Sequence, residues 1–161
     1  MTEKVSTHIN EKENYHMVDI GHKEVTEREA RAQARVFLGE ELYSRLKKDS
    51  HTKKGDVFSV AIIAGIMAAK NCSQLIPLCH PIPLSKVEVD YHFDEGSTII
   101  FEATVKTSGK TGVEMEAMMA ANIAAITLYD MCKSIWKGIV IEEVKLLEKR
   151  GGKSGDYHAQ S

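Results

Sequence analysis

The sequence predicts a domain of the α+β class, in which an antiparallel sheet packs on helices. Three observations support this prediction. Residues 86–93 and 99–106 alternate apolar and polar side chains on either side of a Gly-containing loop, which is typical of a β-hairpin. Residues 110–133 carry apolar side chains at three- and four-residue spacing, which predicts one long helix. Residues 57–70 are almost uninterruptedly apolar, which favours a second, buried helix.

Length, charge and cysteine content narrow the classes of protein to consider. A chain of 161 residues suffices for one domain with a real core, and a net charge of −2 argues against a general nucleic-acid binder. The three cysteines, Cys72, Cys79 and Cys132, are odd in number and irregularly spaced, so we expect no disulfide framework and a cytoplasmic, reducing location. The longest apolar run is too short to span a bilayer, and no leader segment is expected.

The remaining chain divides into one domain and two tails. Residues 1–16 are polar and aperiodic and are expected to form a flexible tail, residues 17–156 a single α+β domain, and residues 157–161 a second flexible tail. Residues 30–38 alternate strictly, which favours a strand, although their alanines leave a helix open. A short helix over 40–48 and a strand over 139–147 complete the predicted elements.

A basic connection leads into the apolar helix. The segment from Arg45 to Lys54 is interpreted either as a solvated loop or as a phosphate-binding segment. Asp56 is a good N-cap for the helix that starts at Val57. Lys54 is therefore expected beside a helix N-terminus, where backbone N–H groups and the helix dipole favour an anion.

All three prolines lie in the segment Pro77–Pro83, which predicts a stiff, extended presentation of Cys79 and His80. Both a structural and a functional role for His80 stay open. We do not expect a zinc site, because these two residues and the other cysteines lack paired ligand spacings.

The long helix has an apolar middle and polar ends. Asp130 and Lys133 near its end lie three residues apart and therefore on one face of the helix. They are interpreted either as a surface ion pair or as a functional pair.

Two Gly-Lys-Ser/Thr triplets, at 109–111 and 152–154, lack the earlier glycine of a nucleotide-binding loop, since Thr104 and Leu147 occupy that position. They predict glycine turns whose lysines can meet an anion.

Several uncommon segments, in order between about residues 17 and 156, resemble a known family. They are Leu75-Ile-Pro-Leu-Cys-His-Pro, Leu84-Ser-Lys-Val-Glu-Val, Gly109-Lys-Thr-Gly-Val-Glu-Met-Glu-Ala, Leu128-Tyr-Asp-Met-Cys-Lys and Gly151-Gly-Lys-Ser-Gly-Asp. They are similar to the signature segments of the molybdenum cofactor biosynthesis protein C family, the cyclic pyranopterin monophosphate synthases.

The resemblance implies a ferredoxin-like α+β fold and a lyase that converts 3′,8-cyclo-7,8-dihydro-GTP to cyclic pyranopterin monophosphate with release of pyrophosphate. It further implies a homohexamer of dimers with active sites between subunits, and neither a nucleic-acid nor a membrane partner. No cofactor or protein-bound metal is implied as a requirement, and Mg²⁺ accompanying the triphosphate stays open. Carried over by position, it implies Asp130 and Lys133 as the catalytic pair. The implied substrate-binding residues are Leu78, Cys79, His80, Met115, Glu116, Lys54, Glu114, Arg28 and Lys153.

These residue types suit the implied chemistry. Ring opening and pterin closure need proton transfers, for which Lys133, Asp130 and His80 are candidates if their pKa values move toward neutrality. Release of pyrophosphate needs cations around the phosphates, which Lys54, Lys153 or Arg28 would supply. Two other hypotheses stay open: a non-catalytic protein that binds a nucleotide or a phosphorylated partner through the basic loop, and a purely structural oligomer.

Overall fold

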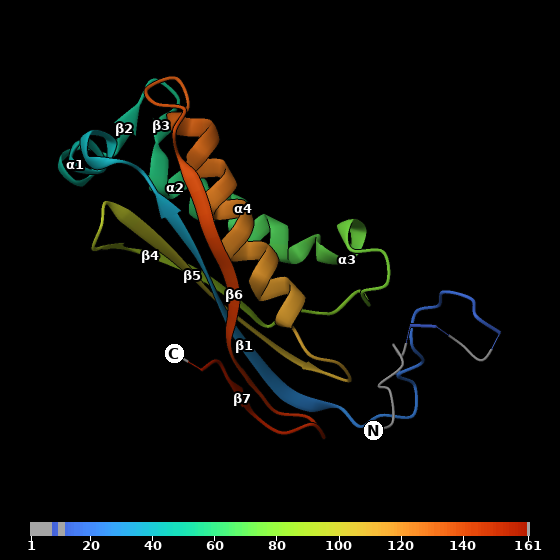
Figure 1. Ribbon diagram of the computed structural model, residues 1–161. Coiled ribbons are helices and arrows are strands. Elements are labelled where there is room, and N and C mark those ends of the chain that lie inside the picture. The colour runs from blue at the N-terminus through green and yellow to red at the C-terminus, as the bar shows by residue number, and fades with distance from the viewer. Residues whose placement is uncertain (1–7, 10–11, 161) are drawn as a thin grey trace.

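The computed structural model describes residues 8–9 and 12–160, which form a five-stranded antiparallel sheet with helices on one face (Figure 1). The strand order is β4-β5-β1-β6-β7, and a separate two-stranded ribbon pairs β2 with β3. The strands are β1 Thr26–Phe37, β2 His51–Thr52, β3 Gly55–Asp56, β4 Lys86–Asp94, β5 Thr98–Gly109, β6 Val140–Arg150 and β7 Tyr157–His158. The helices are α1 Glu40–Lys48, α2 Val57–Lys70, α3 Cys72–Leu75 and α4 Glu114–Cys132.

The main elements follow one another as strand, helix, strand, strand, helix, strand, which is the ferredoxin-like arrangement. Here β1 lies in the middle, paired antiparallel with β5 from Thr26↔Gly109 to Phe37↔Thr98 and with β6 on its other side. The α+β prediction is therefore confirmed, together with its antiparallel sheet packed on helices.

Small side chains bring α4 close to the sheet. Alternate residues of β1 are buried toward the helices, and the buried residues of α4, which pack on the sheet and on α2, are also mostly alanine. Alanine is a strong helix former and needs little space, so one composition serves both packing and helix formation. The fully or almost fully buried members are Ala30, Ala32, Ala34 and Val36 of β1 and Ala117, Ala120, Ala121, Ala124 and Leu128 of α4.

The opposite face of the sheet is charged. Arg31 of β1 pairs with Glu102 of β5 at 2.9 Å, and Arg35 pairs with Asp94 at 2.7 Å. This alternation of buried alanines and paired charges decides the question left open for residues 30–38, which are strand up to Phe37.

Several element boundaries differ from the prediction, and two elements were not predicted. The long helix begins at Glu114 rather than at 110, because the preceding residues leave β5 as a turn in which the Lys110 ammonium donates to the Gly21 carbonyl oxygen at 2.6 Å. The last strand continues to Arg150. The short helix α3 and the β2–β3 ribbon were not predicted.

Some residues of the two predicted tails form backbone pairs with other parts of the chain. Residues 1–7, 10–11 and 161 are outside the described residues, whereas Ile9 bridges Tyr15. Tyr157 and His158 form β7, which pairs with Lys149 and Glu148 of β6. Within the described ranges, none of the helices has the length and apolar character needed to cross a membrane.

Candidate functional site

Helix α4 separates two groups of polar residues, one at each end. Its first turn lies toward the residues that precede β1, and its last turn lies toward the β2–β3 ribbon (Figure 1). Glu116 and Asp130 are 14 residues apart on this helix, which corresponds to about 21 Å along its axis. The two groups are therefore separate within one chain.

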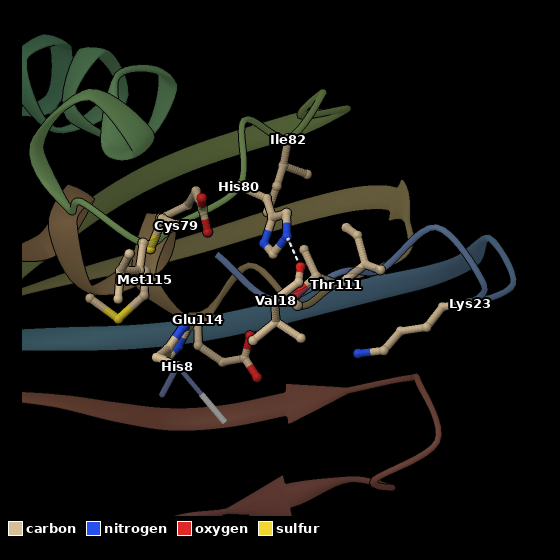
Figure 2. A pocket seen from close by; sticks show the side chains of 13 residues that line it. His8, Val18, Lys23, Cys79, His80, Ile82, Thr111, Glu114 and Met115 are labelled. Atoms are coloured by element: carbon tan, nitrogen blue, oxygen red, sulfur yellow. Dashed lines mark hydrogen bonds between the residues drawn. The ribbon is translucent and has the colours of Figure 1, made fainter. Parts of the chain in front are cut away.

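A pocket of about 260 Å³ lies at the N-terminal end of α4. Three stretches build its walls: the segment before β1, the proline-rich segment and the first turn of α4. Figure 2 shows Cys79, His80, Glu114 and Met115 around this space, with the Lys23 side chain reaching in from another side. The lining residues are His8, Val18, Ile20, Lys23, Leu78, Cys79, His80, Ile82, Thr111, Gly112, Glu114, Met115 and Glu116.

Two hydrogen bonds fix the proline-rich segment over the pocket. Thr107, fully buried in β5, donates its hydroxyl to the Pro83 carbonyl oxygen at 2.6 Å. His80 Nε2 lies 2.7 Å from the Val18 carbonyl oxygen (Figure 2). Because a carbonyl can only accept, Nε2 carries the proton of this hydrogen bond.

Glu114 is held by a cation from β6. The Lys149 ammonium donates to its carboxylate at 2.9 Å and to the Ser154 hydroxyl at 3.1 Å. Lys149 therefore ties the first turn of α4 to the glycine-rich segment that follows β6.

Glu116 is the most deeply buried carboxyl at the pocket, with 3% of its surface exposed. Burial raises its pKa above the ordinary value, and the charge of Glu114 adds to that effect. Burial likewise raises the pKa of Cys79. This end of α4 thus combines a carboxyl with a raised pKa and thiols that stay protonated.

A second pocket of about 200 Å³ adjoins the first through Lys23, which lines both. Its cationic members also include Arg28 and Lys153. Arg28 donates from Nε to the Gly109 carbonyl oxygen at 3.0 Å, and its guanidinium lies against Gly152, where a Cβ would overlap it. Gly152 has φ +83°, a backbone conformation that favours glycine.

The C-terminal end of α4 carries a compact charge cluster. The Asp130 carboxylate is 2.8 Å from the Lys54 ammonium and 2.7 Å from the Lys133 ammonium. Lys54, in the β2–β3 turn, also donates to the Asp130 carbonyl oxygen at 2.9 Å. It thereby satisfies a carbonyl that the helix leaves unpaired in its last turn.

Lys54 has a partner that the sequence did not predict. Asp56 is the N-cap of α2 as predicted, and its carboxylate accepts from the Ser59 N–H at 2.7 Å. Lys54 lies two residues before this N-cap, and its side chain is paired with the end of α4. Anion binding by Lys54 stays a prediction.

The charges of this cluster reinforce one another. Lys133 and Lys54 lower the pKa of Asp130 to about 2, and Asp130 raises the pKa of Lys133. Both shifts run away from neutrality, so Asp130 and Lys133 are ionised near pH 7. Two lysines and one aspartate give the cluster a formal charge of +1. In this arrangement the pair can hold an anion more readily than it can exchange protons.

The sequence model of the MoaC family matches residues 17–152, which include both ends of α4. The chain belongs to the MoaC family. MoaC proteins are enzymes of molybdenum cofactor biosynthesis, and this chain therefore has a role in that pathway. The resemblance stated from the sequence segments is confirmed.

The residues singled out from the sequence of this MoaC protein fall into the two groups. Leu78, Cys79, His80, Glu114, Met115 and Glu116 line the first pocket, and Arg28 and Lys153 line the adjoining one. Lys54, Asp130 and Lys133 are together at the other end of α4. Their catalytic and binding roles stay predictions.

Several residues at the MoaC pockets carried no usable sequence signal. Lys149 lies beyond the strand predicted over 139–147, so its alignment with Glu114 depends on the register of β6. Lys23 and Val18 come from an aperiodic stretch, and Thr107 is one of several strand threonines. Among residues 8–9 and 12–160, no three His, Cys, Asp or Glu side chains are grouped as metal ligands.

Proposed function

We propose that the chain is a cyclic pyranopterin monophosphate synthase, a lyase that converts 3′,8-cyclo-7,8-dihydro-GTP to cyclic pyranopterin monophosphate and pyrophosphate. The observation that carries the proposal is the pocket at the start of α4, where the buried Glu116 carboxyl lies near a cationic surface formed by Lys23, Arg28 and Lys153. Proton transfer and phosphate binding are the two tasks that this conversion requires.

The sizes of the pockets support a divided binding mode. A volume of about 260 Å³ is below the roughly 300–1,000 Å³ typical of ligand pockets, so one pocket alone is small for a nucleotide derivative. The bicyclic base occupies the first pocket, and the triphosphate extends along the adjoining cations. Arg28 suits this role because its guanidinium is already held by Gly109 and can bind phosphate oxygens in a bidentate manner.

Proton transfer is assigned to the groups whose chemistry fits it. Glu116 has a raised pKa, so it can hold a proton closer to neutral pH than an exposed glutamate and exchange it with a ring nitrogen or carbon. His80 presents an imidazole whose Nε2 donates to Val18, so its Nδ1 is the ring nitrogen that contacts the substrate.

The cluster of Lys54, Asp130 and Lys133 completes the site from a neighbouring subunit. A separation of about 21 Å along α4 is too long for one small site, so the proposal requires a homo-oligomer, and the hexamer of dimers implied by the family is the form we expect. Exposed apolar side chains on the helical layer, including Ile63, Met67 and Ile126, support association between copies. The excess positive charge then stabilises the departing pyrophosphate.

The proposed location is the cytoplasm, with Mg²⁺ accompanying the phosphates and no resident cofactor.

Product formation tests the proposal directly. The full chain is incubated with 3′,8-cyclo-7,8-dihydro-GTP, and pyrophosphate and the cyclic phosphate product are both quantified. We expect one pyrophosphate per product, and an unchanged rate for Lys86→Ala, which removes an exposed charge on the edge strand β4. Binding of the substrate without pyrophosphate release would contradict the proposal and favour the binding-protein hypothesis.

A further inference from the structure

A pocket of about 310 Å³ lies between the start of α1 and the loop that follows α4, and the proposed function gives it no role. Figure 1 shows these two segments at the same end of the sheet. None of the residues that line it also lines the two proposed substrate pockets. It is therefore a separate cavity.

The Trp136 indole forms an aromatic wall of this pocket, and two glycines hold it in place. A Cβ on Gly39 would lie 2.9 Å from a carbon of the indole, and a Cβ on Gly138 would overlap the same ring system. The Phe37 ring packs against the indole edge-on, with centroids 6.0 Å apart. Trp136 nevertheless keeps 38% of its surface exposed. An aromatic face that is fixed in advance loses little conformational entropy when it binds a ligand.

The rest of the apolar lining sets the size of the ligand. Leu38 and Leu42, both almost fully buried, line the cavity together with Ile135. A volume of about 310 Å³ is at the lower end of the roughly 300–1,000 Å³ that is typical of ligand pockets. The cavity thus suits a ligand with one ring.

The charged side chains at this pocket favour a cation. Glu40 and Glu41 in the first turn of α1 line it together with Arg45, so the three side chains have a formal charge of −1. Among residues 8–9 and 12–160, neither glutamate carboxylate has a hydrogen-bond or ion-pair partner. An indole face also attracts a cation, and tryptophan is the strongest aromatic partner for one. Carboxylates at a helix start stabilise the helix by themselves, but that role requires neither the cavity nor the indole.

We infer that this pocket is a binding site for a small planar cation with one aromatic ring, such as an aryl amidinium or aryl ammonium ion. The ring packs on Trp136, and the positive group lies toward Glu40 and Glu41. The site is distinct from the pocket at the start of α4, so the inference does not depend on the proposed function.

Tryptophan fluorescence measures binding at this pocket directly, because Trp136 is the only tryptophan of the chain. The full-length protein is titrated with benzamidine, and with neutral benzamide and anionic benzoate as probes of the same size and shape. We expect a saturable change with benzamidine and a Kd of about 1 mM, which is ordinary for so small a ligand. Benzamide and benzoate should bind at least about fivefold more weakly, since they lack the positive charge.

Charge variants separate recognition from non-specific association. Replacing both acidic residues, Glu40→Gln with Glu41→Gln, should weaken benzamidine binding about tenfold and leave benzamide binding unchanged. Asp90→Asn is the matched control, because it removes an exposed carboxylate of the edge strand β4, outside the pocket. If the double variant does not fold, Arg45→Gln decides the question, since loss of the like charge must strengthen benzamidine binding.

The indole N–H signal of Trp136 in ¹H–¹⁵N NMR spectra supplies the second measurement, and it should move with the same Kd. A fluorescence change without movement of this signal, or equal affinity for the three probes, would overturn the inference. Benzamidine binding that is unaffected by the double variant would do the same. So would a complete lack of effect of benzamidine, as expected if a second copy of the chain covers the pocket.

Discussion

For Asp130 and Lys133, the sequence leaves open whether they form a surface ion pair or a functional pair. Their 2.7 Å contact is an ordinary i, i+3 ion pair by geometry, and such exposed pairs contribute only about 0.2–0.5 kcal/mol. Lys54 converts the pair into a three-membered cluster, in which one carboxylate separates two ammonium groups. A cluster that matters for anion binding more than for stability should respond differently to mutation in these two properties.

Lys133→Ala removes one charge, and Asp130→Asn releases both ammonium groups from their fixed positions. Both variants should therefore leave the melting temperature and oligomer size close to wild type, while pyrophosphate release falls by at least about a hundredfold, the scale for losing one preorganised electrostatic contact. Lys133→Arg separates the two roles of the lysine, because it keeps the charge but does not release a proton near neutral pH. The upward pKa of Lys133 leads us to expect that the arginine variant retains substantial activity. An arginine variant as inactive as the alanine variant would show instead that Lys133 transfers a proton.

Glu116 gives a prediction on stability with a defined sign. Burial raises the pKa of its carboxyl, so the folded protein favours the protonated form, and the ionised form carries a penalty at higher pH. That penalty is absent below the ordinary value of 4.5 and fully present above the raised pKa. Glu116→Gln should thus raise the free energy of unfolding at pH 7 to 8, and this gain should shrink as the pH falls toward 4.5, as followed by urea unfolding. A gain of equal size at both ends of this range would contradict the assignment.

At the scale of elements, α2 and α4 approach each other through Gly65. A Cβ at this position would lie 2.7 Å from the Ala120 carbonyl oxygen and 3.3 Å from a Val89 methyl group. Glycine therefore permits the two helices to pack closely over β4, although it weakens α2 by about 1 kcal/mol relative to alanine.

Gly65→Ala should destabilise the protein by about 1–3 kcal/mol, because the backbone of α4 cannot yield as a flexible side chain would. The measurement is urea unfolding, with Lys70→Ala at an exposed position of the same helix as a control that changes little. An alanine variant more stable than wild type would show that helix propensity outweighs the close contact.

The sequence predicted most elements because each carries a local pattern. The hairpin of β4 and β5 and the middle of α4 follow from periodicity, whereas α2 follows from its apolar run, and Asp56 marks the start of α2 correctly. The helix start at Glu114 and the two-residue strands depend on tertiary contacts such as that of Lys110 with Gly21, which leave no periodic trace. For the same reason, Lys149 was missed: it becomes a neighbour of the site only when β6 is placed beside α4.

At the scale of the whole molecule, the proposed site requires two chains, and mixing inactive variants tests this. Glu116→Ala and Lys133→Ala damage opposite ends of α4, so a mixed oligomer contains some sites with both ends intact and should recover part of the activity. Mixing Asp130→Asn with Lys133→Ala is the matched control, since every site then has a damaged C-terminal end and no recovery is expected. Mixed assemblies that stay inactive in the first pair, or a wild-type protein active as a monomer, would contradict a shared site.

The length of helix α4 fixes the distance and the relative orientation of the polar groups at its two ends. Its ends carry the two polar groups, and the buried alanines between them pack on the sheet and on α2. One inserted residue would advance everything beyond it by 1.5 Å and turn it by about 100°, so Asp130 and Lys133 would face another direction or the alanines would leave the sheet. Length changes should accordingly be tolerated in the turn between β4 and β5, and be incompatible with activity anywhere between Glu116 and Asp130.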